Sequence, residues 1–510
     1  MTVGVFVRRF LTEYARNKVN LLLLVVVPVV FGGVVADAMA DAARLLGGPG
    51  GPSVQTAAAG WAAAFPAGIG MYFQTATTRE TDQRRVIAGL PAARLVVARL
   101  LTGLGLAVLA SMAALVTLAV RDGIDEPGRV AAGTVMSALI YVAVGAVTGA
   151  LVPTPVNGNV LVLFVWIVDV FFGPALGAAD RPATRWLPTH YVSLWMIRLP
   201  SGHAGVLGDL GIAMLWTGCG VVVAWAVAVA RTRGVRRPGS RARPGGVAAQ
   251  VLAAVRSSWR DTRRNVALWA LFVAVPVVFI LSADAVTPDR PISLTVREHG
   301  RQLTRTFAMP DVHGATMASI AVASLAALVG LFVVLDNRAG DRRAALAGLR
   351  PGVLLTARLA VLTGTLLLAV AVSLATTALV FQATRWPVYA TGNVLVALTY
   401  GLIGALLAPV FGRVGGVFVA FLLPFLDIGI TQSPMLHPTP VSWSKLLPGY
   451  GGSRVLLDGA LTRGFDEYVG LASASGWLVA LVVIVSVLYR RATVPRVTSG
   501  QGPSRAWRGG

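Results

Sequence analysis

The side chains that most often perform catalysis are scarce in this 510-residue chain and stand in unsuitable patterns. A loop that binds nucleotide phosphates needs Gly-Lys followed by Ser or Thr, but the two lysines, Lys18 and Lys445, follow Asn17 and Ser444. The histidines show no His-Glu-x-x-His pattern of a catalytic zinc site. We therefore expect no ATP hydrolysis, no metal and no bound cofactor in this chain. The acid and histidine neighbours are expected to be solvated loop residues, namely Glu298 with His299 and Asp311 with His313.

Two aspartates lie within apolar segments and could act in a pathway or gate. Asp169 in VWIVDVFFG and Asp427 in LPFLDIGIT occupy equivalent places, each near the end of its segment. A charge in hydrocarbon is costly enough to indicate function, although a carboxylate near the membrane surface can also be hydrated. The pattern Ala-Leu-x-Tyr-x-x-x-Gly-Ala also occurs twice, around Tyr141 and Tyr400. We take these four residues as candidate pathway or gate residues.

The amino-acid composition indicates whether these residues lie in a soluble protein or in a membrane protein. Hydrophobic residues make up 55% of the chain and charged residues only 13%, and the mean hydropathy is +0.72. These values exclude a soluble multidomain protein and predict a multi-pass protein of the plasma membrane. The net charge of +22 therefore indicates membrane orientation and lipid contact rather than nucleic-acid binding. The single cysteine, Cys219, excludes an intramolecular disulfide.

Twelve segments are apolar and long enough to cross a membrane. The least certain ends are those of the fifth and eleventh segments, because the loops before them are very short. Most of the 44 lysines and arginines lie in inner segments if both termini are cytoplasmic, which is the orientation that the positive-inside rule favours. The predicted spans are 19–39, 57–76, 100–120, 130–152, 156–172, 208–230, 266–283, 314–335, 359–381, 391–411, 414–430 and 468–489.

The chain also contains an internal duplication. Residues 16–31, RNKVNLLLLVVVPVVF, align without gaps with residues 264–279, RNVALWALFVAVPVVF. Two six-span units that begin and end on the same side have the same orientation, so we predict an all-α polytopic membrane protein made of two parallel six-helix repeats. The predicted organisation is a first half at 1–230, a basic flexible cytoplasmic linker at 231–247, a second half at 248–490 and a basic cytoplasmic tail at 491–510.

Each half begins with an amphipathic stretch that is predicted to lie on the inner membrane surface as an interfacial helix. Each half also carries a mixed-charge loop between its second and third spans, which ends in a turn and a proline. The residues singled out in the interfacial helices are Phe6, Arg9, Glu13, Arg16, Arg256, Trp259, Asp261 and Arg264. Those in the two loops are Arg79, Glu80, Arg84, Arg85, Pro91, Arg338, Asp341, Arg342, Arg343 and Pro351.

This layout resembles the permease subunits of the ABC-2 family of ABC exporters. Glu80, Leu90, Pro91 and Arg99 match the family pattern in the first half, whereas Asp82-Gln83 replaces the usual Gly-Thr. The resemblance implies that both loops are coupling helices, which dock on a separate ABC ATPase present in two copies. It also implies that the partner uses the ATP and that the chain exports cargo. A cavity lined by Val, Leu, Phe and Trp would favour a hydrophobic or amphipathic drug, antibiotic or lipid-like cargo.

A proton-coupled secondary exporter of the major facilitator type is the alternative. Twelve spans, cytoplasmic termini and two parallel halves fit that class too, and residues 336–343 resemble its Asp-Arg-x-Gly-Arg-Arg loop. Against it, the matching loop of the first half lacks the glycine, interfacial helices are unexpected, and few acids lie near mid-membrane. A membrane-embedded enzyme is the third possibility and lacks any catalytic cluster.

Overall fold

The structure is a computed structural model that describes residues 3–16, 18–152, 154–176, 182–199, 205–232, 265–346, 349 and 351–493. It is 83% helical, as expected for a polytopic membrane protein built from helices. The predicted interfacial residues Arg256, Trp259, Asp261 and Arg264 lie outside the described residues, as do residues 233–247 of the predicted linker and residues 494–510 of the tail.

The first half is helical throughout its regular elements. These are α1 (Val3–Arg16), α2 (Lys18–Val30), the π-helix η1 (Phe31–Val35), α3 (Ala36–Leu45), α4 (Gly51–Ala76), α5 (Arg79–Ile87), α6 (Ala92–Arg121), α7 (Pro127–Leu151), α8 (Pro155–Phe172), the 3-10 helix η2 (Pro182–Trp186), α9 (His190–Ile197) and α10 (Gly205–Thr232).

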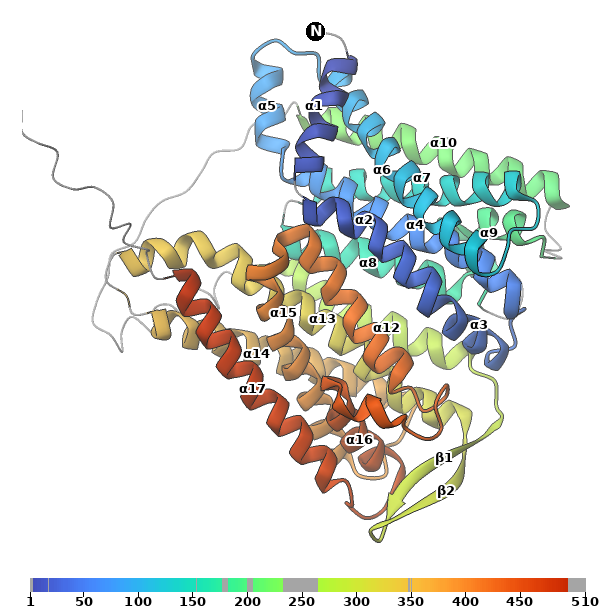
Figure 1. Ribbon diagram of the computed structural model, residues 1–510, viewed down its shortest axis with the longest axis vertical. Coiled ribbons are helices and arrows are strands. Elements are labelled where there is room, and N and C mark those ends of the chain that lie inside the picture. The colour runs from blue at the N-terminus through green and yellow to red at the C-terminus, as the bar shows by residue number, and fades with distance from the viewer. Residues whose placement is uncertain are drawn as a thin grey trace, which may run out of the picture.

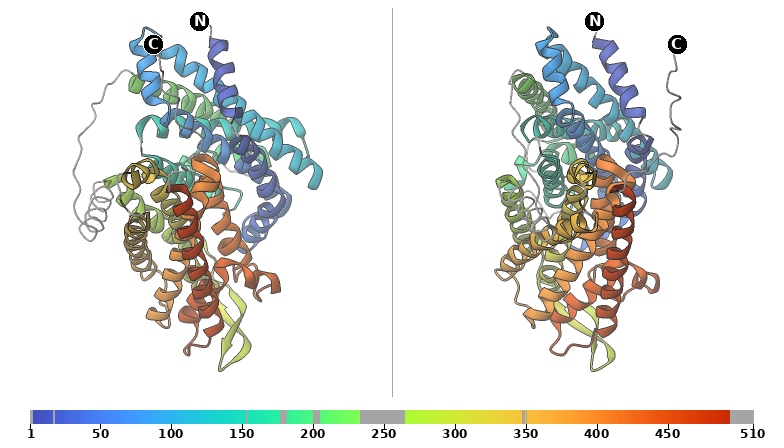
Figure 2. Two further views of the ribbon diagram at one scale, coloured as in Figure 1. Left: turned by 60° about the vertical axis from the view of Figure 1, so that its left-hand side comes forward. Right: turned by 90° about the vertical axis from the view of Figure 1, so that its left-hand side faces the viewer.

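The second half adds a pair of strands to a similar order of helices. Its elements are α12 (Val266–Val286), β1 (Pro291–Glu298), β2 (Arg301–Ala308), α13 (Met309–Leu346), α14 (Pro351–Thr377), α15 (Trp386–Pro424), the π-helix η3 (Phe425–Thr431), the 3-10 helix η4 (Ser442–Leu446), α16 (Pro448–Leu461) and α17 (Tyr468–Thr493). Figure 1 shows the two halves as separate helical bodies, with α1 and α5 at one end of the first half and α3 and α9 at the other. In both turned views of Figure 2 the blue helices of the first half lie above the orange and red helices of the second along the long axis.

Among the described residues, ten helices are long and apolar enough to cross a membrane. The sequence predicted twelve spans, and two features account for the difference. Helix α4 is rich in Ala and Gly and almost wholly buried, so its composition is less apolar than that of a lipid-facing helix. The predicted tenth and eleventh spans are joined in one helical stretch, Trp386–Thr431, whose backbone breaks at Gly412 with φ 65° and ψ −157°. The count of twelve stays a prediction.

A β-hairpin between α12 and α13 corrects the expectation of a purely α-helical chain. Strands β1 and β2 pair antiparallel around His299 and Gly300, which both have positive φ as a tight two-residue hairpin turn requires. Glu298 and His313 are buried, so the expectation that they are solvated was wrong. Glu298 pairs with Arg305 at 2.5 Å. His313 contacts Thr287 through Nδ1.

The most extensive helix pair is α4 with α7 in the first half and α13 with α15 in the second. A Cβ atom at Gly145 would collide with the carbonyl oxygen of Gly68, and one at Gly404 would collide with that of Ala327. Backbones can approach this closely only where small residues face each other. These glycine contacts therefore hold the inner helices of each half in fixed register.

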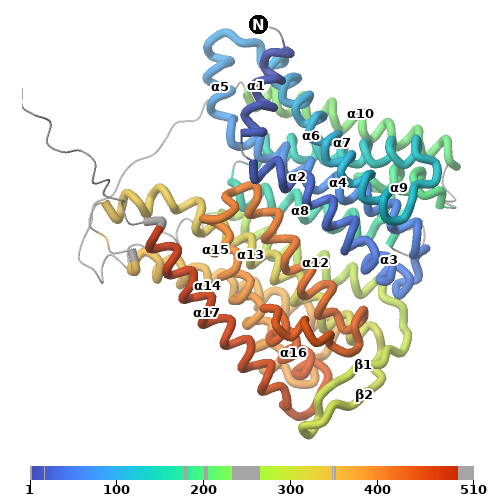
Figure 3. Tube along the Cα trace, viewed as in Figure 1, coloured from blue at the N-terminus to red at the C-terminus, as the bar shows by residue number. Residues whose placement is uncertain are grey.

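The two halves meet through reciprocal helix pairs. Helix α8 of the first half packs on α12 of the second, and α15 of the second half packs on α2 of the first. Figure 3 shows these four helices along the boundary between the halves. The Asn157 and Asn265 side chains exchange hydrogen bonds of 2.6 and 3.1 Å across it. Asn265 also caps α12 by accepting a hydrogen bond from the Leu268 amide.

Candidate functional site

A buried ion pair attaches the short helix α5 to the start of α6. Arg99 donates from Nε to Asp82 Oδ2 at 2.5 Å and from Nη2 to Asp82 Oδ1 at 2.9 Å. Both side chains are less than a tenth exposed, 8% for Arg99 and 5% for Asp82. Arg85 adds a third contact to the same carboxylate at 3.1 Å. A two-pronged Arg–carboxylate pair fixes orientation as well as distance, so α5 and α6 are held as one unit.

Helix α1 covers this ion pair. The Arg99 guanidinium lies 4.2 Å from the centre of the Phe10 ring, a cation–π geometry. Phe6 and Phe10 are buried against Leu95 and Ala98 of α6. The predicted apolar face of this helix therefore contacts protein, whereas its charged residues are exposed: Arg9, Glu13 and Arg16.

The second half repeats the ion pair at equivalent positions. Arg358 on α14 donates to Asp341 Oδ1 at 2.8 Å, and Tyr489 on α17 donates to Asp341 Oδ2 at 2.6 Å. Asp341 is buried, with 1% of the residue exposed. A tyrosine hydroxyl thus contributes here where Arg85 contributes in the first half. Asp82 thus joins α5 to α6, and Asp341 joins the end of α13 to α14.

The segments that carry these aspartates differ in shape but end in the same way. Helix α5 is separate because Thr77 and Thr78 return hydrogen bonds to the preceding turn, whereas residues 336–346 continue α13 without a break. The expected separate helix is therefore absent from the second half. Leu90 N donates to Arg85 O, and Leu349 N donates to Ala344 O at the equivalent place. In the first half, this bond and the positive φ of Gly89 form a helix-ending Schellman turn.

Helix α5 and residues 336–346 each have an exposed face opposite their buried contacts. Arg84 and Glu80 are exposed on α5, and Ile87 at its end is 72% exposed. At the positions equivalent to Arg84 and Ile87, Arg343 is exposed and Leu346 is 71% exposed. A large exposed apolar side chain beside an arginine, present twice, is typical of a protein contact. We define the coupling face as Arg84, Ile87, Arg343 and Leu346.

The other predicted loop residues lie elsewhere. Arg85 is bound to Asp82, and Arg79 and Arg338 each line a pocket between helices. Arg342 is exposed beside Arg343. Pro91 precedes α6 as its N-cap, and Pro351 begins α14.

The four candidate gate residues form two buried pairs. In the first half, Tyr141 Oη donates to Asp169 Oδ2 at 2.9 Å. Thr189, which caps the N-terminus of α9, donates to the same carboxylate from its amide at 3.1 Å and from its hydroxyl at 2.8 Å. Asp169 is only 2% exposed. The carboxylate is therefore buried and held by three protein hydrogen bonds.

The second half contains the same arrangement with one change of partner. Tyr400 Oη donates to Asp427 Oδ2 at 2.6 Å, and the Gly449 amide in the first turn of α16 donates to it at 2.8 Å. Gln432 adds a hydrogen bond of 3.2 Å to Oδ1. Asp427 is 4% exposed, so hydration as the explanation for either aspartate was wrong. In both halves an anion lies at a helix N-terminus, which favours negative charge. We call these two arrangements the outer locks.

An apolar cleft of about 540 Å³ separates the halves between α8, α12, α13 and η3. Aromatic rings gather at its edge, where Phe421 lies 5.5 Å from Trp166 and 5.7 Å from Phe425 between ring centres. The lining is apolar except for Ser324, and it comprises Val160, Leu163, Phe164, Ile167, Phe171, Val275, Phe279, Ile320, Ala321, Ser324, Leu325, Leu328, Phe421 and Phe425. Such a lining offers apolar side chains and very few polar groups to a bound molecule.

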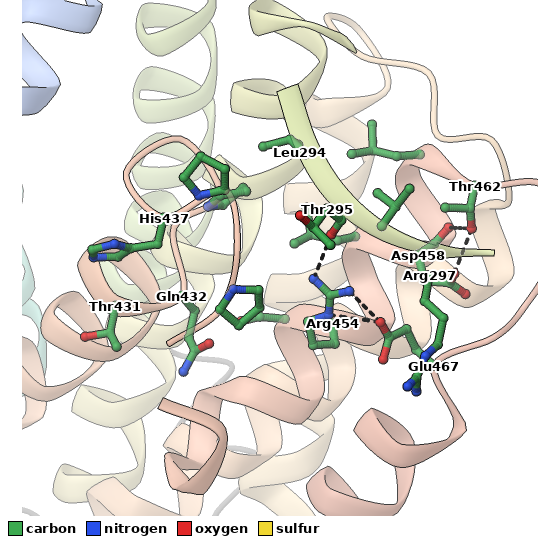
Figure 4. A pocket seen from close by; sticks show the side chains of 17 residues that line it. Leu294, Thr295, Arg297, Thr431, Gln432, His437, Arg454, Asp458, Thr462 and Glu467 are labelled. Carbon is green, nitrogen blue, oxygen red and sulfur yellow. Dashed lines mark hydrogen bonds and ion pairs between the residues drawn. The ribbon is translucent and has the colours of Figure 1, made fainter. Parts of the chain in front are cut away.

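A more polar pocket of about 550 Å³ lies beneath the hairpin in the second half. Figure 4 shows Arg454 between Thr295 and Glu467, and the Arg454–Glu467 ion pair measures 2.6 Å. Asp458 nearby pairs with Arg385 at 2.9 Å. Burial raises the pKa of the Asp458 carboxyl, and hydrogen bonds from Thr462 and Arg385 oppose that change. These contacts secure the outer end of α16, whose first turn holds Asp427.

Asp341 was named in the sequence, but Asp82, Thr189 and Gly449 were not assigned to a site although a signal existed. Asp82 and Asp341 stand at the same offset as Arg99 and Arg358, but Asp82 was taken only as a departure from the family pattern. Thr189 and Gly449 each follow a Leu-Pro pair, which marks the start of a short helix. Tyr489 gives no local signal, because it lies far along the chain from Asp341.

Comparison with known proteins identifies one family match, in the first half of the chain. Residues 53–230, which include α5, the first ion pair and the first outer lock, match the family described as ABC-2 family transporter protein. No curated protein matches the chain. Members of this family are the membrane components of ABC transporters and act with an ABC ATPase subunit. Residues 53–230 therefore resemble an ABC-2 transporter domain, and this match supports an ABC-2 type permease.

Proposed function

We propose that the chain is a complete export permease with both six-span halves in one polypeptide, driven by two copies of a separate ABC ATPase. The observation that carries the proposal is that the coupling face occurs in both halves, each time on a segment that an Asp–Arg ion pair ties to the next long helix. An ATPase that pushes on Arg84 and Ile87 would move α5, and the ion pair would pass that movement to α6. Arg343 and Leu346 would act in the same way on α14. The ATP is used by the partner, because no phosphate-binding lysine motif is present in the sequence.

The cargo that we propose is hydrophobic or amphipathic, such as a drug, an antibiotic or a lipid-like product. The cleft between α8 and α12 supports this class, since Ser324 is the single polar side chain among its lining residues. Twelve spans with cytoplasmic termini in the plasma membrane complete the proposal. In that topology α4 is the second span, and the break at Gly412 separates the tenth from the eleventh.

Opening toward the outside would require the outer locks to release. Each lock holds the end of the fifth span of one half against a short outer helix through Asp169 or Asp427. The cleft is lined by Phe171, two residues after Asp169, and by Phe425, two residues before Asp427. Movement of either fifth span would therefore change the outer lock and the cleft wall together.

The energy source is tested in inverted membrane vesicles from cells that express the chain with its ABC ATPase. Uptake of a fluorescent bisbenzimide dye is followed with ATP, with ATP plus a protonophore, and with a proton gradient alone. The proposal predicts uptake that needs ATP and survives the protonophore. Uptake that needs only the proton gradient would instead identify a secondary transporter of the major facilitator type and would refute the proposal.

A further inference from the structure

Each half contains a pocket at the same place, beside its buried Asp–Arg pair. The first pocket lies between α4, α6, α7 and α10, and the second between α13, α15 and α17; each encloses about 460 Å³. Arg79 lines the first, and Arg338, its equivalent, lines the second. Ala146 and Ala405 are equivalent wall residues. The two pockets share their position in the half, their volume and an equivalent arginine, which indicates that they bind the same kind of molecule.

The walls of both pockets are mainly apolar. The first is lined by Met71, Thr75, Arg79, Asp82, Leu95, Val96, Arg99, Leu100, Ala146, Ala150, Ala228, Arg231 and Thr232. The second is lined by Val334, Leu335, Arg338, Ala405, Leu406, Ala408, Pro409, Val485, Leu488 and Tyr489. Such walls suit hydrocarbon chains better than water or a soluble anion.

Each pocket contains an arginine, Arg79 or Arg338, whose positive charge could bind an anion. Within the described part of the chain, no carboxylate forms an ion pair with Arg79 or Arg338. The acid in the first pocket, Asp82, is already neutralised by Arg99 and Arg85. Arg231, exposed at the end of α10, adds a second positive charge there. Both pockets therefore combine an apolar wall with an unmatched guanidinium.

We propose that each pocket binds one anionic phospholipid from the cytoplasmic leaflet, with its phosphate on Arg79 and Arg231 in the first half and on Arg338 in the second. A guanidinium suits this role because it binds phosphate oxygens through two parallel hydrogen bonds. The arginines follow the second span of each half, which ends on the cytoplasmic side in the proposed topology. Anionic headgroups are concentrated there, and each nearby arginine strengthens their binding.

The bound lipid would contact the elements that tie the coupling face to the spans. Asp82 and Arg99 line the first pocket, and Tyr489, which holds Asp341, lines the second. The choice of the cytoplasmic leaflet and any effect of lipid on ATPase coupling rest on the proposed function, whereas retention of an anionic lipid by the two pockets does not.

Native mass spectrometry of the purified full-length chain tests the binding. The protein is released from detergent after incubation with equal amounts of phosphatidylglycerol and phosphatidylethanolamine. We expect up to two retained lipids with phosphatidylglycerol preferred, and one lipid fewer in each of Arg79→Gln/Arg231→Gln and Arg338→Gln. The expected loss in affinity is about fivefold for each arginine removed. Arg84→Gln and Arg343→Gln, exposed but outside the pockets, are the matched controls and should retain both lipids.

Three results would overturn the proposal. The first is equal retention of the two lipids, and the second is unchanged retention in the pocket variants. The third is full displacement of phosphatidylglycerol by millimolar sn-glycerol 3-phosphate, which carries the phosphate without acyl chains and would identify a simple anion site. Size-exclusion chromatography of every variant separates loss of lipid from loss of fold, because the substitutions change charge on exposed or half-buried side chains.

Discussion

Asp82 on α5 accepts two hydrogen bonds from the Arg99 guanidinium on α6, and both side chains are buried. Charges taken out of water are costly unless they are paired with good geometry, so this contact specifies one arrangement of α5 against α6. A related contact occurs in the second half, where the partly buried Arg358 and the Tyr489 hydroxyl both donate to the buried Asp341 carboxylate. The proposed ABC ATPase would need such rigid connections to transmit movement from α5 to α6 and from residues 336–346 to α14.

The substitution Asp82→Asn should lower the free energy of unfolding by about 3 kcal/mol, because it leaves Arg99 buried without its charged partner. Thermal unfolding of the purified protein in detergent measures this effect. Glu80→Gln, an exposed substitution on the same helix, is the control and should change stability very little. Equal unfolding temperatures for the two variants would contradict the role assigned to the ion pair.

The coupling segments were predictable in position but not in internal structure. The charge pattern and the proline after it located residues 79–91, and the structure places a helix and a capped turn there. Charge alone could not separate Arg84, which is exposed, from Arg85, which is bound to Asp82. That distinction depends on packing against α1 and α6, which a local pattern does not contain.

The outer locks should act separately in the two halves. Tyr141→Phe removes one hydrogen bond to Asp169 and should weaken the attachment of α9 by about 1.5 to 3 kcal/mol, as for a hydrogen bond to a charged group. Hydrogen–deuterium exchange should then rise in α9 and stay unchanged in α16. Tyr400→Phe should give the reverse, so each variant is the control for the other. Identical exchange patterns in the two variants would reject the locks as local attachments.

Gly449 has no room for a side chain. A Cβ atom there would lie 2.8 Å from Asp427 Oδ2, so Gly449→Ala should displace the carboxylate or the first turn of α16 and destabilise the protein by about 1 to 3 kcal/mol. Gly476 on α17 has open space around it, so Gly476→Ala should stabilise that helix by up to about 1 kcal/mol. Thermal unfolding distinguishes the two. A stable Gly449→Ala protein would show that the contact is loose.

Apolar composition identified some membrane spans in the sequence better than others. Helices with little buried surface, such as α10, are easily recognised in the sequence because residues that face lipid must be apolar. Helix α4 is less apolar because it touches protein on nearly every side, and small residues serve there instead. The hairpin was missed although Ile292, Leu294 and Val296 alternate with polar residues before His299-Gly300, because the segment was read only as a long loop.

The cleft should carry the cargo. Ser324→Trp adds bulk to a buried wall residue and should reduce ATP-dependent dye uptake at least about tenfold by blocking the cleft, while ATPase association persists. Val116→Trp, at a 60% exposed site on α6, adds similar bulk outside the cleft and should leave uptake close to that of the wild type. If both variants transport normally, the cleft is not the pathway.

The most direct measurement is copurification of a co-expressed ABC ATPase with coupling-face variants. Arg84→Glu with Arg343→Glu, and Ile87→Asp with Leu346→Asp, should each lose most of the bound ATPase while membrane insertion is retained. Arg16→Glu with Arg491→Glu changes two exposed arginines outside the coupling face and should keep it. Retention of the ATPase by both coupling-face variants at the wild-type level would contradict the account.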